Sequence, residues 1–322
     1  MIIGVVFPGQ GCQYDKMGLD FIDSSEESMK FCKSVEEYTS VKVIDLLTDV
    51  AKIDEFSQLR IIVAEILTYY AFQSKINGSE IKIKYTGGHS LGEYSALYVS
   101  GILSLSELLN LVMFRNKVIQ FNQFPEKTSM IAVTDSDISN INKSISQLNI
   151  KNLFPSNINS YKQIVYSGSI SAINHLQEKL AESTRCIVLN VNQGYHSPLM
   201  KDASEKFRDF IQRSDFTNIA MKIEDMKVLN NLTGEYYNSK DEVLFNLPKQ
   251  LISPVNWIKV IETLSLDVDG IFEVGPGKTL TKFNKNILKK NKVDNIYLGH
   301  VENTDTLNLE IGKILYEDSK FE

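Results

Sequence analysis

The pattern of apolar and polar positions predicts alternating strands and helices. Ile2–Phe7 is a continuous apolar run followed by Pro8-Gly9-Gln10-Gly11, which is typical of a buried strand entering a tight glycine loop. Leu59–Ile76 has the spacing and length of a helix. Ser104 and Glu107 have capping-box spacing and predict a helix that continues to about Asn122. Further strands are predicted at Ile81–Tyr85 and Gly270–Val274, and a further helix at Val255–Ser265.

The middle of the chain has a different order of elements. Residues 128–195 predict strand, helix, strand, strand, helix, strand, which is the order of a ferredoxin-like unit. We therefore expect an α/β fold in which residues 1–127 and 196–322 form a large domain and 128–195 a small inserted domain. The predicted strands of the insert are Met130–Val133, Leu153–Asn159, Gln163–Ser167 and Cys186–Val191, and its helices are Ile138–Leu148 and Ile170–Ala181.

Composition narrows the class of protein. The chain has 322 residues, of which 43% are hydrophobic and 23% charged, as in ordinary globular proteins. A net charge of −6 argues against a nucleic-acid binder. Three widely spaced cysteines indicate neither a disulfide framework nor a zinc site, which fits a reducing cytoplasm. We expect no signal peptide, no membrane helix and no metal.

Gly88-His89-Ser90-Leu91-Gly92 is a G-x-S-x-G motif between a predicted strand and a predicted helix. A serine on such a sharp turn needs glycines beside it, because larger side chains would clash. The turn exposes the hydroxyl at a helix N-terminus, where backbone N–H groups can stabilise an oxyanion. By itself the motif also fits a plain glycine turn with a capping serine, so its context between strand and helix carries the argument.

A nucleophilic serine needs a general base, and the chain has only four histidines. His89 lies inside the turn, His175 falls in a predicted surface helix, and His300 follows a strand near the C-terminus. His196 lies where the predicted insert rejoins the large domain, a common place for an active site. On its own, His196 would equally suit a buried structural role.

Several ordered segments together resemble the malonyl-CoA:acyl-carrier-protein transacylase family and the acyltransferase domains of polyketide synthases. They are Phe7-Pro8-Gly9-Gln10-Gly11, Gly88 through Leu97, Arg115 through Gln120, His196-Ser197-Pro198-Leu199-Met200, Gln250 through Trp257, and Glu273-Val274-Gly275-Pro276-Gly277. They follow the order of the family and span most of the chain, which makes them far more specific than one motif. The resemblance implies a hydrolase-like α/β domain with a ferredoxin-like insert.

The resemblance also implies roles for individual residues. Ser90 would be the nucleophile and His196 its general base, oriented by the backbone carbonyl of Gln250. The backbone N–H groups of Gln10 and Leu91 would form the oxyanion hole.

Arg115 would hold the free carboxylate of the malonyl group, because a planar guanidinium pairs with a carboxylate through two hydrogen bonds. Without the resemblance, an exposed helix arginine would be the simpler interpretation. Two positions depart from the family pattern: Cys12 replaces a common serine, and Tyr195 stands where malonyl-using polyketide enzymes more often have phenylalanine. Malonyl remains the expected acyl group.

The resemblance implies transfer of malonyl from malonyl-CoA to the phosphopantetheine thiol of an acyl carrier protein through an acyl-serine, in polyketide or fatty-acid synthesis. Malonyl-CoA is then a substrate, no cofactor is needed, and we expect a monomer acting in trans. Three alternatives stay open: an acyl hydrolase of the same fold, which would lack the arginine; an α/β-hydrolase esterase, with Asp135 or Asp137 as the acid; and a non-catalytic carrier-protein binding module.

One further pattern concerns the carrier protein. Lysines near the C-terminus recur with helical spacing on one side of a predicted helix, opposite Leu280, Phe283 and Ile287. Because carrier proteins are acidic, this side could steer them electrostatically, although a solvated helix face explains the pattern equally well. The lysines are Lys278, Lys282, Lys285, Lys289 and Lys292.

Overall fold

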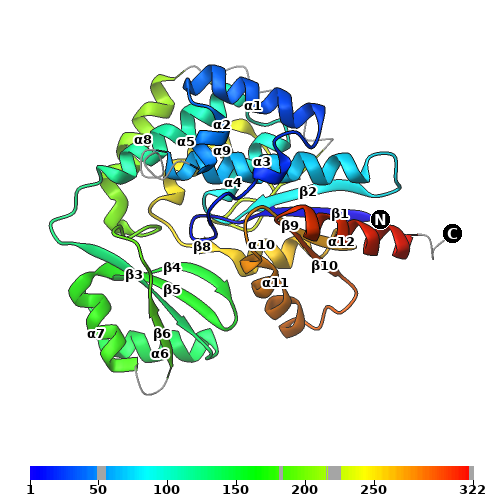
Figure 1. Cartoon of the computed structure of the whole chain (residues 1–322). Helices are drawn as coiled ribbons and strands as arrows, with labels where there is room; N and C mark the ends of the chain where they lie inside the picture. The colour runs from blue at the N-terminus through cyan, green and yellow to red at the C-terminus, as the bar shows by residue number, and fades with distance from the viewer. Residues whose placement is uncertain (49–55, 181–183, 215, 217–225, 319–322) are drawn as a thin grey trace.

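The computed structural model describes residues 1–48, 56–180, 184–214, 216 and 226–318. Two five-stranded sheets organise these residues, with helices around them (Figure 1). In the first sheet the strand order is β10-β9-β1-β2-β7, and all neighbours are parallel. Its strands are β1 (Ile2–Phe7), β2 (Lys82–Gly88), β7 (Lys227–Val228), β9 (Gly270–Val274) and β10 (Tyr297–Val301).

Alternate residues of β1 point to opposite faces of this sheet, as strand geometry requires. Ile3, Val5 and Phe7 join one buried cluster, which includes α3 (Ser57–Ile76), whereas Val6 joins another with α10 (Trp257–Leu264) and α11 (Thr279–Lys290). Both faces of β1 are therefore covered, which explains why Ile2–Phe7 is apolar throughout. The remaining helices that contribute to the first cluster are α1 (Glu26–Thr39), α2 (Val43–Thr48), α4 (Gly92–Val99), α5 (Leu105–Gln120), α8 (Lys201–Arg213), α9 (Lys240–Gln250) and α12 (Thr304–Asp318).

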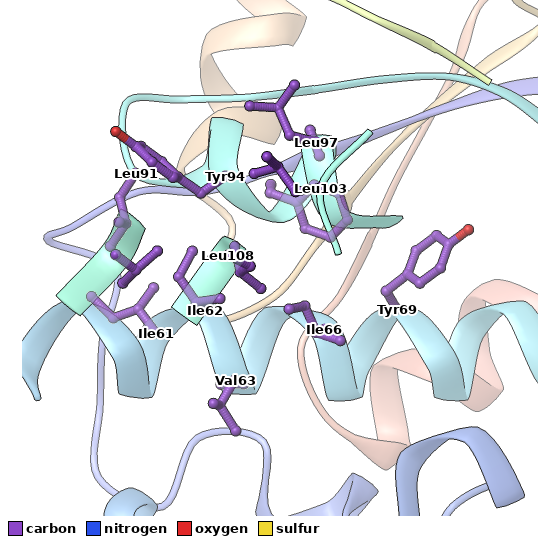
Figure 2. Packing of buried hydrophobic residues seen from close by; sticks show 14 of the residues in the cluster. Ile61, Ile62, Val63, Ile66, Tyr69, Leu91, Tyr94, Leu97, Leu103 and Leu108 are labelled. Carbon is purple, nitrogen blue, oxygen red and sulfur yellow. The ribbon is translucent and has the colours of Figure 1, made fainter. Parts of the chain in front are cut away.

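Helix α3 is the centre of the larger cluster. Ile61, Ile62 and Ile66 of α3 lie against Leu91 and side chains of α4 and α5 (Figure 2). This packing places α3, α4 and α5 side by side. The three helices therefore hold the start of α4, where the serine motif lies, in a rigid apolar setting.

The second sheet has the strand order β6-β3-β5-β4-β8. Its neighbours are antiparallel except for β8, which runs parallel to β4. Helices α6 (Ile138–Leu148) and α7 (Ile170–Leu180) contribute Ile141, Ile173 and Leu176 to a cluster with β3 and β5. Figure 1 shows this sheet below the large helical layer. Its strands are β3 (Thr128–Thr134), β4 (Leu153–Ser160), β5 (Gln163–Ser169), β6 (Arg185–Val188) and β8 (Val255–Asn256).

Most predicted elements are confirmed, including the capping box at Ser104 and Glu107. The helix predicted at Val255–Ser265 is wrong at its start, because Val255 and Asn256 form β8 and pair with β4. The strand predicted at Cys186–Val191 ends at Val188. Short 3₁₀ turns lie at Leu19–Phe21 and Pro198–Met200. Of the predicted helix Ile170–Ala181, Ala181 lies outside the described residues.

Among the helices that the structure describes, none is long and apolar enough to cross a membrane. Within the same residues, no cluster of three or more histidine, cysteine, aspartate or glutamate side chains is arranged to hold a metal ion. Cys12, Cys32 and Cys186 are free thiols.

Candidate active site

Ser90 lies on a sharp turn between β2 and α4, with a left-handed φ of 53°. The flanking glycines are required by close backbone contacts. A Cβ on Gly88 would lie 2.0 Å from the carbonyl carbon of Gly92, and one on Gly92 would lie 2.3 Å from the carbonyl oxygen of Pro8. Backbone atoms cannot give way as side chains can, so the turn forms only with glycine at both positions.

Asn231 holds this turn from a distant part of the chain. Its Oδ1 accepts the backbone N–H of Ser90 at 2.8 Å, and its Nδ2 donates to the carbonyl of Gly88 at 2.5 Å. The residue is fully buried. Sequence reasoning missed Asn231, because no local motif marks an asparagine that contacts a turn only in the folded chain.

Ser90 and His196 meet directly, as predicted. Oγ of Ser90 is 2.6 Å from Nε2 of His196, and Nδ1 of the same ring is 2.7 Å from the backbone oxygen of Gln250. A carbonyl oxygen can only accept, so Nδ1 carries the proton and Nε2 has a free lone pair for the serine hydroxyl. Gln250 is the last residue of α9, where helix carbonyls lack a partner within the helix.

The environment of His196 keeps its imidazole neutral. Burial and, to a smaller extent, the positive charge of Arg115 lower the pKa of His196 to about 3, although the hydrogen bond to Gln250 acts in the opposite direction. His196 also has a left-handed φ of 56°. Backbone strain at both Ser90 and His196 is typical of functional positions held by surrounding structure.

Arg115 is buried and points at the same hydroxyl. Its Nη2 lies 3.4 Å from Oγ of Ser90 and 3.2 Å from Oε1 of Gln250. Its Nη1 donates to Oε1 of Gln58 at 2.7 Å, and the guanidinium lies over the ring of Tyr94. Gln58, on α3, is a second residue that sequence reasoning missed. The buried cation corrects the simpler interpretation of Arg115 as an exposed helix residue.

The loop that carries Gln10 lies beside the serine turn. A Cβ on Gly9 would be 2.4 Å from the carbonyl oxygen of His89, so the two backbones are in contact. Tyr195 forms a hydrogen bond with the side chain of Gln10. Leu91 stands at the N-terminal end of α4. The structure therefore places the loop of Gln10 against the backbone of His89, directly before Ser90, and Leu91 directly after it.

The other histidine of the motif has a different contact. Nε2 of His89 is 2.8 Å from Oδ1 of Asn159 on β4, and its ring packs edge-on against Trp257. Burial lowers the pKa of His89 to about 4. His89 therefore links the serine turn to the second sheet and does not serve as the partner of Ser90.

Comparison with known proteins agrees with this geometry. The family model described as "Acyl transferase domain" matches residues 5–243. The chain belongs to this acyltransferase family. The resemblance drawn from the six motifs is thereby confirmed.

Individual relatives extend the match to most of the chain. The malonyl CoA-acyl carrier protein transacylase of Bacillus subtilis is 28% identical over 297 residues, which cover 90% of this chain and 92% of that protein. The polyketide biosynthesis protein ThaF of Burkholderia thailandensis is 30% identical over 88% of this chain but only 24% of its own length. The crystal structure of the malonyl CoA-acyl carrier protein transacylase of Clostridium perfringens has a TM-score of 0.86 at 29% identity, covering 99% of both chains.

Proposed function

We propose that this protein transfers a malonyl group from malonyl-CoA to the thiol of an acyl carrier protein through an ester on Ser90. The observation that carries the proposal is the meeting of three groups: Oγ of Ser90 lies 2.6 Å from Nε2 of His196 and 3.4 Å from Nη2 of Arg115. The pair with histidine supplies a nucleophile and its base. The arginine supplies a binding group for an acyl chain that ends in a carboxylate.

In the first step His196 takes the proton of Ser90 while Oγ attacks the thioester carbonyl. The backbone N–H groups of Gln10 and Leu91 stabilise the oxyanion at the start of α4. The bond to sulfur then breaks, and the CoA thiolate leaves with the proton from His196. Malonyl remains as an ester of Ser90, with its carboxylate paired to Arg115.

The second step is the reverse with another thiol. The phosphopantetheine thiol of the carrier protein gives its proton to His196 and attacks the ester, and Ser90 leaves with a proton. The backbone oxygen of Gln250, 2.7 Å from Nδ1 of His196, stabilises the imidazolium that forms in each step. The chemistry uses no metal and no redox cofactor.

We assign the chain to two domains: a hydrolase-like α/β domain of residues 1–127 and 196–322, and a ferredoxin-like domain of residues 128–195. The strand order β6-β3-β5-β4 and the antiparallel pairing within the second sheet support a ferredoxin-like unit. The parallel first sheet with helices on both faces supports the hydrolase-like domain. The strand β8, which completes the second sheet, comes from the large domain.

We expect a cytoplasmic monomer whose acidic carrier protein docks partly on α11. Lys282, Lys285 and Lys289 of α11 are exposed, while Leu280 and Ile287 are buried and Phe283 is half-buried, as the spacing predicts. Lys278 and Lys292 flank the helix. The buried side of α11 contacts Trp257 through Asn284, and Trp257 packs on His89 next to the nucleophile.

The alternatives fit the site less well. An acyl hydrolase of this fold has no carboxylate to bind, yet a buried arginine faces Ser90. An esterase triad needs an acid on the histidine, but Nδ1 of His196 meets the carbonyl of Gln250. Asp137 instead caps α6, and its carboxylate is 3.5 Å from Nζ of Lys290. A non-catalytic binding module would not need the short contact between Ser90 and His196.

Intact mass spectrometry tests the proposal. Incubation with malonyl-CoA should add one malonyl group, which peptide mapping places on Ser90, and a carrier protein should remove it. Changing His196 to Ala should slow acylation by roughly 10²–10⁴-fold, as expected for loss of a general base. A malonyl adduct on a Ser90→Ala variant would contradict the proposal.

A further inference from the structure

Glu93 is a buried acid that the reaction steps above do not use. It lies in the first turn of α4, and its side chain is almost fully buried. Oε1 accepts the backbone N–H of Asn231 and the hydroxyl of Tyr237, each at 2.9 Å. Oε2 accepts Nε2 of Gln250 at 2.5 Å. Each of these three groups is a neutral donor, so the described contacts suit an ionised carboxylate.

The contact with Gln250 decides which way that amide faces. Nε2 of Gln250 lies against Oε2 of Glu93 and also donates to the carbonyl of Ser90 at 2.9 Å. Oε1 of Gln250 faces the other way and accepts Nη2 of Arg115 at 3.2 Å. A reversed amide would set its oxygen against two oxygens and its NH₂ against the guanidinium.

We propose that Glu93 is a positioning residue for acyl selectivity: its carboxylate fixes the amide of Gln250, whose oxygen then holds Arg115 beside Ser90. Gln250 is thus used twice. Its backbone oxygen orients His196, and its side chain carries the orientation set by Glu93 to the arginine. This inference rests on the proposed role of Arg115 as the group that binds the malonyl carboxylate.

An alternative role for Glu93 is to stabilise the serine turn alone. Its carboxylate also accepts the backbone N–H of Asn231, whose side chain in turn accepts the backbone N–H of Ser90. The substitution Glu93→Gln separates the two roles. A glutamine can keep an oxygen where Oε1 accepts Asn231 and Tyr237, so the turn keeps its support. Its NH₂ then faces Nε2 of Gln250, donor against donor. Turning the Gln250 amide relieves that conflict, but it presents an NH₂ to Arg115.

The rates of Ser90 acylation by malonyl-CoA and by acetyl-CoA test this inference. In Glu93→Gln we expect malonylation to fall about 10- to 100-fold, the effect of a hydrogen bond to a charged group, while acetylation changes little. A protein in which Glu93 only supports the turn would lose both rates equally. Equal loss, or no loss of either rate, would overturn the inference.

Glu65→Gln is the matched control. Glu65, on α3, is as deeply buried as Glu93. Its carboxylate accepts a hydrogen bond from the hydroxyl of Ser95 at 2.5 Å, and Ser95 lies on the same helix as Glu93, α4. It makes no described contact with Ser90, His196, Gln250 or Arg115. Both acylation rates should therefore stay at the wild-type level in this variant.

Gln250→Met keeps the test decisive if Glu93→Gln does not fold. Methionine retains the backbone oxygen for His196 and removes the amide, so malonylation should again fall far more than acetylation. The double variant should then be no worse than either single one, because both changes break the same link. If wild-type protein forms no malonyl ester at Ser90, the proposed function fails; if it does and neither variant alters the ratio of rates, only this inference fails.

Discussion

The guanidinium of Arg115 contacts the hydroxyl of Ser90, with Nη2 of the arginine 3.4 Å from Oγ of the serine. A buried cation thus lies beside the hydroxyl that we propose as the nucleophile. Gln58 and Gln250 hold the guanidinium through neutral amide oxygens, and neither cancels its charge. An incoming carboxylate would therefore meet a positive charge that neither amide neutralises, in a site of low dielectric, where such a pair is strong.

Arg115→Ala should lower malonyl transfer by about 1.5–3 kcal/mol of transition-state stabilisation, the worth of a hydrogen bond to a charged group. Acetyl transfer should be unchanged or faster, because acetyl has no carboxylate to lose. Measuring kcat/KM for both acyl-CoA substrates decides between these outcomes. Equal losses for both would mean that Arg115 is needed for the fold of the site and not for recognition.

The activity should persist at pH values well below the pKa of an unperturbed histidine. The base must be neutral, and burial together with Arg115 lowers the pKa of His196 to about 3. A depressed pKa keeps the neutral form present as pH falls, so kcat/KM should show no inflection near pH ~6.5, the pKa of an unperturbed histidine. A pH profile of acetyl transfer in Arg115→Gln tests the direction in which the arginine charge shifts the pKa of His196. Without the arginine charge, the acid limb should move to higher pH, and a shift to lower pH would contradict this assignment.

Gly92→Ala should prevent the tight turn that positions Ser90, because the new Cβ would lie 2.3 Å from the carbonyl oxygen of Pro8. We expect loss of acylation together with a lower midpoint of thermal unfolding. Gly312→Ala is the matched control: Gly312 lies in α12, and its Cβ would meet nothing within 4 Å. Alanine is favoured over glycine in a helix by roughly 0.5–1 kcal/mol, so this variant should be active and at least as stable as the wild type. Wild-type acylation in Gly92→Ala would show that the tight turn is not required.

Replacing Lys282, Lys285 and Lys289 of α11 with glutamate should slow transfer to a carrier protein, most strongly at low salt. The three side chains are exposed, and reversing their charge would repel an acidic partner. Transfer to a small thiol should not change, which separates docking from chemistry. If the two acceptors respond alike, or if neither responds, α11 is an ordinary solvated face.

The sequence alone determined most of the strands, the serine turn and the family. Ile2–Phe7 and Gly270–Val274 were predicted with their observed bounds, because strands covered on both faces are mainly apolar and are followed here by glycine or proline. The serine turn was predictable because its five residues form a recognisable local motif, in which the backbone of Gly92 leaves no room for a Cβ on Gly88. The choice of His196 among four histidines also needed only the sequence and the resemblance.

The tertiary structure decided how these parts are held. Asn231 contacts Ser90, and Gln58 contacts Arg115, although each pair is far apart in the chain. Asparagine and glutamine also occur in ordinary loops and on surfaces, so neither residue marks the site in the sequence. Val255 and Asn256 form a strand only because β4 lies beside them, whereas their local pattern favours a helix. Burial shields Arg115 from solvent, and its Nη2 points at Oγ of Ser90. Local propensity and residue spacing depend on neighbouring residues and can be read from the sequence. A contact between distant segments forms only when the chain packs, so the sequence pattern does not show it.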